Sequence, residues 1–389
     1  MDKSSLYVPS WPCPTASQFA SSNATMPFPL AREHAKHFYV ARNGIYHLFG
    51  LFGWRAPENV LVPNYHSGNE TSAIRAAGVP MRFYPVNENF ELDRGAIEQL
   101  CTPYTRALYV IHYAGWPQPM EWVADFCRRR NLLLIEDCAL SFLSEYNGRP
   151  LGSFGDYAIH CLYKSLPLPN GAVLSGRGPL PEVKTHRPDA ISVAGRCAEL
   201  SLESLRSSMP VAGKLLADLK AALGRGLTAA KVERERVGNI GFDLSKVDTA
   251  MSPLCHWLLQ RLDYRAIVER RRNNFQHLAE LLKGKVSLLP VELSEGICPL
   301  FLPVLAENKH ETAEELRRRG IGVVEFWNEG DPAADDGAGA ARFLRRHVIE
   351  LPIHQNVTEA QVEAMARVVL ASIRPVEKKY EERVCFANS

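Results

Sequence analysis

The stretch ALYVIHYAGWPQPMEWVADFCRRRNLLLIEDCA, residues 107–139, decides the fold class. It opens with an almost continuous apolar run (107–113), passes through an amphipathic segment (119–130) and returns to an apolar run (132–139). Apolar strands with a helix between them indicate a mostly parallel sheet that is covered on both faces. The stretch therefore predicts a strand–helix–strand unit of an α/β fold.

The same alternation continues on both sides of this unit. A helix is predicted from about Ile45 to Phe52, directly after the turn-like pair Asn43-Gly44. Further strands are predicted at 60–66, 81–86, 156–163 and 171–176, and further helices at 68–78 and 92–100, the latter with Asp93 near its start. In such sheets ligands bind beyond the carboxyl ends of the strands, so polar residues at those ends matter most.

A chain of 389 residues is long enough for two α/β domains. Later elements are expected to be a strand (298–305), a helix (310–320), a flexible loop (331–340) and a helix (358–373) capped by Thr358. The domain prediction is an N-terminal arm (1–40), a large domain (41–250) with an atypical helical region (178–240) that includes a helix at 214–227, a long connecting helix (251–282) and a small C-terminal α+β domain (283–389).

Composition and charge favour an ordinary globular protein. Apolar residues make up 46% and charged residues 23%, and 45 basic against 43 acidic residues leave a net charge of +2. No basic stripe supports nucleic-acid binding, and the cluster Arg270-Arg271-Arg272 is interpreted as the solvated face of a helix.

The nine cysteines are scattered, without CxxC spacing, which favours reduced thiols and a cytoplasmic protein over a secreted one. The N-terminus lacks the apolar run of a signal peptide, and no segment has the length needed to span a bilayer. We therefore expect a cytoplasmic protein without a membrane span.

Two strand-end residues could carry chemistry. The run LLLIED ends in Glu136 and Asp137, whose side chains point to opposite sides of a strand, so one of them can face a pocket. Such a carboxylate could pair with a pyridinium nitrogen, bind a metal, act as a base or simply form a surface contact. Lys164 ends the next candidate strand, where loss of hydration favours the neutral amine needed for a Schiff base. A lysine and an anion together are what pyridoxal phosphate (PLP) requires.

Other candidates carry weaker signals. Asn43-Gly44 before a helix could seat a phosphate on free backbone N–H groups, although a plain turn is the commoner meaning. His66 could stack on a flat ring, whereas His112 is better explained as a structural histidine. No His/Cys/Asp cluster has metal-ligand spacing, so no metal site is predicted, and no nucleotide-binding glycine motif is present.

Taken together, four segments resemble the DegT/DnrJ/StrS family of fold type I PLP enzymes, best known as aminotransferases that act on nucleotide-linked keto sugars. ENVLVPNYHSGNETSAIRAAGVPMRFYPVNENFELD (58–93) is similar to the family's strand–helix–strand block. ALYVIHYAGWPQPM (107–120) is similar to the family segment VHLYGxPxDM. The segment LLLIEDCALSFLSEYNGRPLGSFGDYAIHCLYK (132–164) resembles the family block that runs from the cofactor aspartate to the cofactor lysine. ELPIHQNVTEAQVEAMARVVL (350–370) resembles the family's ending.

The resemblance assigns roles to individual residues. Lys164 would hold PLP as a Schiff base and shuttle the proton, and Asp137 would keep the ring nitrogen protonated. The remaining cofactor-binding residues it implies are Asn43, Gly44, Ile45 and Tyr46 at the phosphate, His66 over the ring, and His160 near the position of the family's phosphate-binding serine. The family's Gly-Thr is Gly44-Ile45 in this chain, and its glutamine after the aspartate is replaced by Leu140.

The function implied is transfer of an amino group, from glutamate or another amino acid, to a nucleotide-linked keto sugar in polysaccharide or natural-product biosynthesis. The resemblance also implies a homodimer with the active site at the subunit interface. Two alternatives remain open from the sequence: a PLP enzyme of the same fold acting on a different amine or keto substrate, and a non-catalytic PLP-binding protein.

Overall fold

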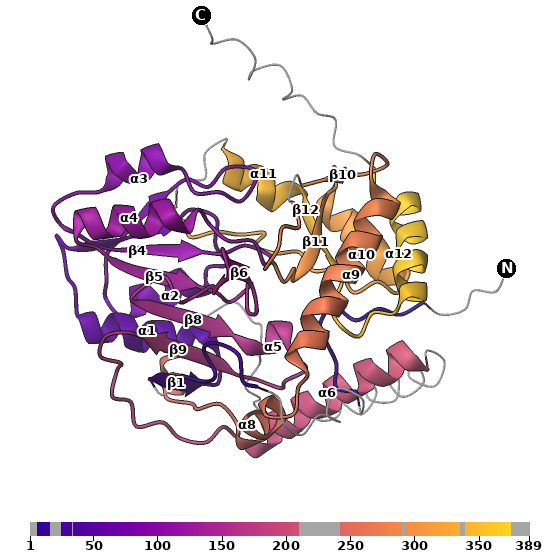
Figure 1. Cartoon of the computed structure of the whole chain (residues 1–389), viewed down its shortest axis with the longest axis horizontal. Helices are drawn as coiled ribbons and strands as arrows, with labels where there is room; N and C mark the ends of the chain where they lie inside the picture. The colour runs from indigo at the N-terminus through magenta and orange to yellow at the C-terminus, as the bar shows by residue number, and fades with distance from the viewer. Residues whose placement is uncertain are drawn as a thin grey trace, which may run out of the picture.

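The computed structural model describes residues 6–15, 25–32, 34–209, 242–289, 292–334 and 339–374. Figure 1 shows a large sheet with its helices, coloured indigo to magenta, beside a smaller orange and yellow α+β part. The predicted helix at 214–227 lies outside the described residues. Among those that are described, no helix is both long and apolar enough to cross a membrane.

The large sheet has seven strands in the order β1-β9-β8-β5-β4-β2-β3. The strands β3, β2, β4, β5 and β8 pair in parallel, whereas β9 and β1 pair antiparallel at one edge. Their bounds are β1 Ala35–Phe38, β2 Asn59–Pro63, β3 Met81–Tyr84, β4 Thr105–Ile111, β5 Leu133–Asp137, β8 Tyr157–Cys161 and β9 Ala172–Gly176. Every residue of β2, β8 and β9 is buried, as expected for strands covered on both faces. The mostly parallel sheet is confirmed.

The helices of this part follow the predicted alternation. They are α1 Ala41–Phe52, α2 Asn69–Ala76, α3 Arg94–Leu100, α4 Met120–Arg130 and the short α5 Leu162–Ser165. Asp93 caps α3 by accepting a hydrogen bond from the amide of Ala96 at 2.9 Å, as its position suggested. A two-stranded ribbon, β6 Glu145–Tyr146 with β7 Arg149–Pro150, lies in the connection between β5 and β8.

The predicted start of α1 at Ile45 was wrong, because the helix begins four residues earlier at Ala41. Asn43-Gly44 is therefore inside the helix instead of forming a turn before it. A Cβ atom at Gly44 would lie only 2.7 Å from Cδ1 of Ile159, so the glycine lets the helix pack closely on the sheet. Close packing, which a single sequence does not display, explains this residue.

The smaller part is built on a three-stranded antiparallel sheet with a separate apolar core. Its strands are β10 Ser287–Leu288, β11 Phe301–Leu305 and β12 Val348–Pro352, and its helices are α10 Lys309–Arg318, α11 Ala340–His347 and α12 Glu359–Ser372. Thr358 and Gln361 form a capping box at the start of α12, which confirms the predicted helix start. Helix α11 and strand β12 were not predicted, and residues 335–338 of the predicted loop lie outside the described part.

The single long helix predicted at 251–282 was also wrong. The structure has two helices, α8 Pro253–Leu259 and α9 Tyr264–Leu282. Ser252 caps the first, and Asp263 caps the second by accepting a hydrogen bond from Ala266 at 3.0 Å. The Tyr264 hydroxyl donates to the carbonyl of Leu259 at 2.6 Å across the break. A second capping residue within a continuous amphipathic pattern was the missed signal. The domain boundaries themselves stay a prediction.

Two further segments complete the part of the chain that bears on function. Helix α6 spans Ala190–Ser208, and the 3-10 helix η2 spans Leu244–Lys246. The N-terminal segment 6–15 runs over the smaller part, where the backbone of Val8 bonds Gly320 at 2.8 Å and Gly322 at 2.7 Å. It also contacts α6, because Ser204 donates to the carbonyl of Pro14 at 3.0 Å. This segment and α6 therefore support each other.

Candidate active site

A cavity of about 630 Å³ lies beyond the carboxyl ends of the parallel strands. Its volume is within the range of roughly 300–1,000 Å³ that is typical of small-molecule sites. Four of the elements that line it contribute the following residues: Asp137 from β5, Lys164 from α5, Ala41 and Arg42 from the start of α1, and Arg196 and Glu199 from α6. The smaller part closes the cavity with the segment 324–329.

Asp137 is the last residue of β5 and is only 1% exposed. One carboxylate oxygen accepts a hydrogen bond from the Tyr109 hydroxyl at 2.5 Å, and the other accepts from the amide of Ala139 at 2.8 Å. Burial, aided by the negative charge of Glu70, raises the pKa of Asp137 to about 6, while the two hydrogen bonds and the charge of Lys164 oppose that rise. A buried carboxylate of this kind gains strongly from a cationic partner.

Glu136 points away from the cavity, as strand alternation predicted. Its carboxylate accepts hydrogen bonds from the amides of Gly152 at 2.8 Å, Phe154 at 2.8 Å and Gly155 at 2.5 Å. These bonds hold the connection that leads into β8. Two adjacent acidic residues therefore have different positions: Glu136 stabilises the fold, and Asp137 lines the cavity.

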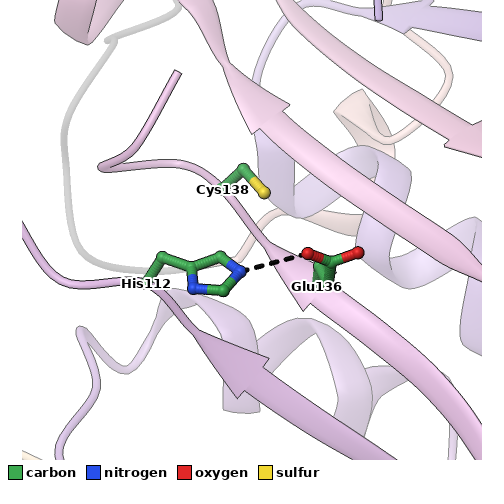
Figure 2. A group of neighbouring side chains, drawn as sticks. All are labelled: His112, Glu136 and Cys138. Carbon is green, nitrogen blue, oxygen red and sulfur yellow. Dashed lines mark hydrogen bonds and ion pairs between the residues drawn. The ribbon is translucent and has the colours of Figure 1, made fainter. Parts of the chain in front are cut away.

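Figure 2 shows that His112 and Cys138 lie beside Glu136, all three buried and with potential ligand atoms within 4.8 Å of one another. The amide of Gln118 donates to Nδ1 of His112 at 3.1 Å, so Nε2 carries the proton and donates to Glu136 at 3.2 Å. Both oxygens of Glu136 already accept two hydrogen bonds each. Hydrogen bonding within the protein accounts for this cluster, and His112 is a structural histidine.

Lys164 lies on α5, one short turn beyond β8, and not at the end of the strand itself as predicted. Its amino nitrogen is 5.6 Å from the ring centroid of Phe326 in the smaller part. Strands β5 and β8 pair in parallel with Asp137 opposite Ile159, which brings the chain after β8 to the same sheet edge as Asp137. Lys164 and Asp137 consequently line one cavity.

Arg271 of α9 fixes the backbone next to Lys164. Its guanidinium donates to the carbonyl of Ser165 at 2.9 Å and to the carbonyl of Leu300 at 3.1 Å. The side chain is 1% exposed, and burial lowers the pKa of Arg271 to about 10. The interpretation of Arg270–Arg272 as a solvated face was therefore wrong for the middle residue, which connects α9, α5 and the chain before β11.

Two histidines named from the sequence lie outside the cavity lining. His66 is fully buried, accepts a hydrogen bond from the amide of Gly68 at 2.9 Å and stacks on Phe83 with ring centroids 5.7 Å apart. His160 lies 3.4 Å from the carbonyl of Leu151, and burial lowers its pKa to about 4. Neither ring is among the residues that line the cavity, and the contact of these two rings with a cofactor stays a prediction.

The start of α1 contributes a different set of residues from the predicted one. Ala41, Arg42 and Ile45 line the cavity, since residues three and four apart share one helix face. Asn43 instead donates to the carbonyl of Lys246 at 2.9 Å, and Tyr46 packs on Phe242 with ring centroids 5.4 Å apart. Gly44 faces the sheet, as described above. Of the four residues predicted at the phosphate, Ile45 alone is among the lining residues.

The lining residues that had no counterpart in the sequence reasoning include Trp11, Arg42, Arg196 and Glu199. Arg42 lies in the first turn of α1, so it could have been predicted if the helix start had been placed at Ala41. For the other three no local signal exists, because they come from the N-terminal segment and α6, and only tertiary contacts bring them to the sheet edge.

The fold is that of known aminotransferases. It matches the crystal structure of the aminotransferase TlmJ from Streptoalloteichus hindustanus with a TM-score of 0.60, 20% identity, and coverage of 87% of this chain and 86% of that one. It also matches Spr1654 from Streptococcus pneumoniae, solved in its PLP form, with a TM-score of 0.63, 15% identity, and coverage of 94% and 98%. The chain therefore has the α/β fold of the fold type I PLP-dependent enzymes.

Sequence comparison narrows this class to a family. Residues 49–171 match the DegT/DnrJ/EryC1/StrS aminotransferase family. The dTDP-4-dehydro-2,3,6-trideoxy-D-glucose 4-aminotransferase of Saccharopolyspora spinosa is 35% identical over 324 residues, which cover 79% of this chain and 76% of that protein. The chain belongs to the DegT/DnrJ/EryC1/StrS aminotransferase family, whose members are PLP-dependent enzymes.

Proposed function

We propose that this protein is an aminotransferase in which Lys164 binds PLP covalently and Asp137 pairs with the nitrogen of its ring. The observation that carries the proposal is that Asp137, at the end of β5, and Lys164, on the helix that follows the neighbouring strand β8, line one cavity. The charge of Lys164 lowers the pKa of Asp137 against the larger effect of burial, which supports their lying near each other. An amine and a carboxylate across one cavity are the two groups that PLP chemistry needs.

The remaining lining residues fit the rest of the cofactor. Helix α1 begins at this end of the cavity, with the positive end of its dipole, and Arg42 adds a guanidinium at the same place, so this end of the cavity suits a phosphate. Asp137, held in position by Tyr109 and Ala139, suits a protonated ring nitrogen. We assign the phosphate to Ala41 and Arg42 in place of Asn43, Gly44 and Tyr46.

When bound, PLP would act as the electron sink that allows a proton to leave the carbon bearing an amino group. Lys164 then holds and moves that proton with its amine, and Asp137 keeps its negative charge against the ring nitrogen. Arg271 positions Lys164 by anchoring the carbonyl of Ser165. The aromatic side chains of Phe326 and Trp327 help to exclude water from one end of the cavity.

We propose glutamate, or another amino acid, as the amino donor and a nucleotide-linked keto sugar as the acceptor. The relative from Saccharopolyspora spinosa, named for a 4-amino transfer to a dTDP-linked dehydro sugar, supports this substrate class. The product would be an amino sugar for a polysaccharide or a natural product. The eight cysteines of the described part are all free thiols, which supports a cytoplasmic enzyme.

We also propose a homodimer. Helix α8 presents two large apolar side chains to solvent, Leu254 at 38% and Trp257 at 50% exposed, and Leu244 of η2 is 57% exposed. Exposed apolar groups of this size favour a protein interface. Equilibrium sedimentation should give twice the mass of the chain, and a monomer at micromolar concentration would contradict this part of the proposal.

The test of the function is spectroscopic. The protein reconstituted with PLP should show the visible absorption band of a lysine-bound cofactor, and L-glutamate should convert it to the spectrum of the amine form. Lys164→Ala should abolish the band, because no other lysine lines the cavity in the described part of the chain. Lys283→Ala, at an exposed lysine of α9's C-terminus, is the matched control and should keep it. A band that survives Lys164→Ala would refute the assignment.

A further inference from the structure

Helix α6 and the N-terminal segment form a wall of the cavity that does not belong to the sheet edge. Trp11, Arg196 and Glu199 of this wall line the cavity. The helix begins at Asp189, which accepts a hydrogen bond from Ser192 at 2.8 Å, and its far end is held by Ser204 on the carbonyl of Pro14. Tyr7 adds a hydrogen bond to Glu203. We call this the outer wall.

Arg196 is the cation of the outer wall. Its side chain is 19% exposed, and one guanidinium nitrogen lies 2.8 Å from the carboxylate of Glu199, which is half exposed. The Nε of Arg196 is buried and has no hydrogen-bond partner in the part of the chain that the structure describes. A buried donor left without a partner costs free energy, so an acceptor placed there would be stabilising.

Arg196 shares the cavity with two other cations, Arg42 and Lys164, and with the carboxylates of Glu70, Asp137, Glu199, Glu325 and Glu329. Both Arg42 and Arg196 oppose the rise that burial causes in the pKa of Tyr163, and all three residues line the cavity. With Lys164, three cations line one cavity. If Lys164 and Arg42 hold the cofactor, Arg196 is the cation left for a substrate.

We propose that Arg196 is a specificity-determining residue that binds an anionic oxygen group of a substrate, and that Glu199 occupies the guanidinium until that group arrives. The inference rests on the proposed function and adds a residue to it. The anion is either the carboxylate of the amino donor or a phosphate of the nucleotide-linked acceptor, because the planar guanidinium fork binds both with two parallel hydrogen bonds. A half-exposed Glu199 is released to solvent at small cost.

Two titrations distinguish a donor carboxylate from an acceptor phosphate. Titration of the PLP-loaded enzyme with L-glutamate, followed by the loss of the visible band, reports on the donor carboxylate. Calorimetric titration with dTDP reports on the phosphates of the acceptor. Arg196→Gln should raise the half-saturating concentration in one of these titrations by about 10- to 100-fold, the effect of losing one charge-assisted hydrogen-bond pair. Arg196→Lys should recover part of it.

The decisive comparison is with Glu199→Gln. If Arg196 binds substrate, Glu199→Gln removes the carboxylate that competes for its guanidinium. The half-saturating concentration should then stay the same or fall by a few-fold, whereas Arg196→Gln should raise it. If the ion pair merely stabilises α6, both substitutions should weaken binding alike. Arg206→Gln is the matched control, because it breaks another Arg–Glu pair on the same helix, with Glu203, outside the cavity lining. It should leave both titrations unchanged.

The outcomes are distinct. A shift with L-glutamate assigns the donor carboxylate, and a shift with dTDP assigns the phosphate. Unchanged titrations in Arg196→Gln, or equal weakening by Glu199→Gln, would overturn the inference while leaving the proposed function intact. A wild-type protein without the visible band, or one that L-glutamate does not convert, would instead refute the proposed function.

Discussion

The sheet edge and the outer wall face the same cavity but are built differently. At the sheet edge, Asp137 and Lys164 follow buried strands whose register fixes where they lie. In the outer wall, Arg196 and Glu199 lie on a helix attached through side chains and through the N-terminal segment. The residues that we propose to carry the chemistry are thus held by the most constrained part of the fold. Residues that would select the substrate lie on the less constrained part.

This difference sets the size of the effects to expect. Changes at the sheet edge should affect turnover, because the groups there are the ones we propose to hold the cofactor. Changes in the outer wall should alter the half-saturating substrate concentration and leave turnover at saturation unchanged. A variant that changes turnover from the outer wall, or only the concentration dependence from the sheet edge, would contradict this division.

Asp137→Asn should lower kcat about 100- to 1,000-fold, because a neutral amide cannot stabilise a protonated ring nitrogen. The amide oxygen can still accept the hydrogen bond of Ala139, so the fold should survive. Single-turnover kinetics with L-glutamate measure this effect. A kcat within tenfold of wild type would show that Asp137 has no part in the chemistry.

Glu136→Gln, one residue earlier, should leave kcat nearly unchanged and lower the free energy of unfolding by about 1–3 kcal/mol. The amide group replaces one acceptor oxygen by a donor, which leaves a buried N–H of Gly152, Phe154 or Gly155 without its partner. Urea unfolding measures it. Equal kinetic effects from Glu136→Gln and Asp137→Asn would contradict their separation into fold and site.

His354 makes the outer wall sensitive to acid. Its Nδ1 accepts from the amide of Asn356, so Nε2 donates to the carbonyl of Pro9 at 2.9 Å. Burial lowers the pKa of His354 from 6.5 to about 3. Between these values the unfolded chain takes up a proton that the folded chain refuses, so stability is full above pH 6.5 and falls as the pH drops toward 3.

His354→Gln should remove this contribution, because glutamine does not titrate and can still donate to Pro9. The expected difference is a loss of up to about 2 kcal/mol between pH 6.5 and pH 5 in wild type that the variant lacks. Urea unfolding at the two pH values measures it. Identical pH dependence in both proteins would mean that His354 is protonated as readily in the folded chain as in the unfolded one.

The sequence predicted well which residues lie at the sheet edge, because the patterns that place them are local. Strand alternation separated Glu136 from Asp137, and an apolar run placed Lys164 next to the same edge. The family resemblance, now established by comparison, was also carried by these segments. The capping residues Asp93 and Thr358 were equally local signals.

Errors arose where packing overrides local preference. Gly44 resembled a turn but serves close contact between α1 and the sheet, which moved the helix start and the cavity-facing residues. Arg271 belonged to a charged cluster yet is buried on backbone carbonyls. The outer wall depends on contacts such as Ser204 with Pro14, separated by 190 residues, which no local pattern encodes.

The most direct test of the account is to identify the residue that carries the cofactor. Reduction of the PLP-loaded protein with borohydride fixes the cofactor on its lysine, and peptide mass spectrometry then locates the added mass. We predict modification of Lys164 alone, in one copy per chain. Prior conversion of the protein with L-glutamate should prevent this modification. Modification of any other lysine, or none at all, would contradict it.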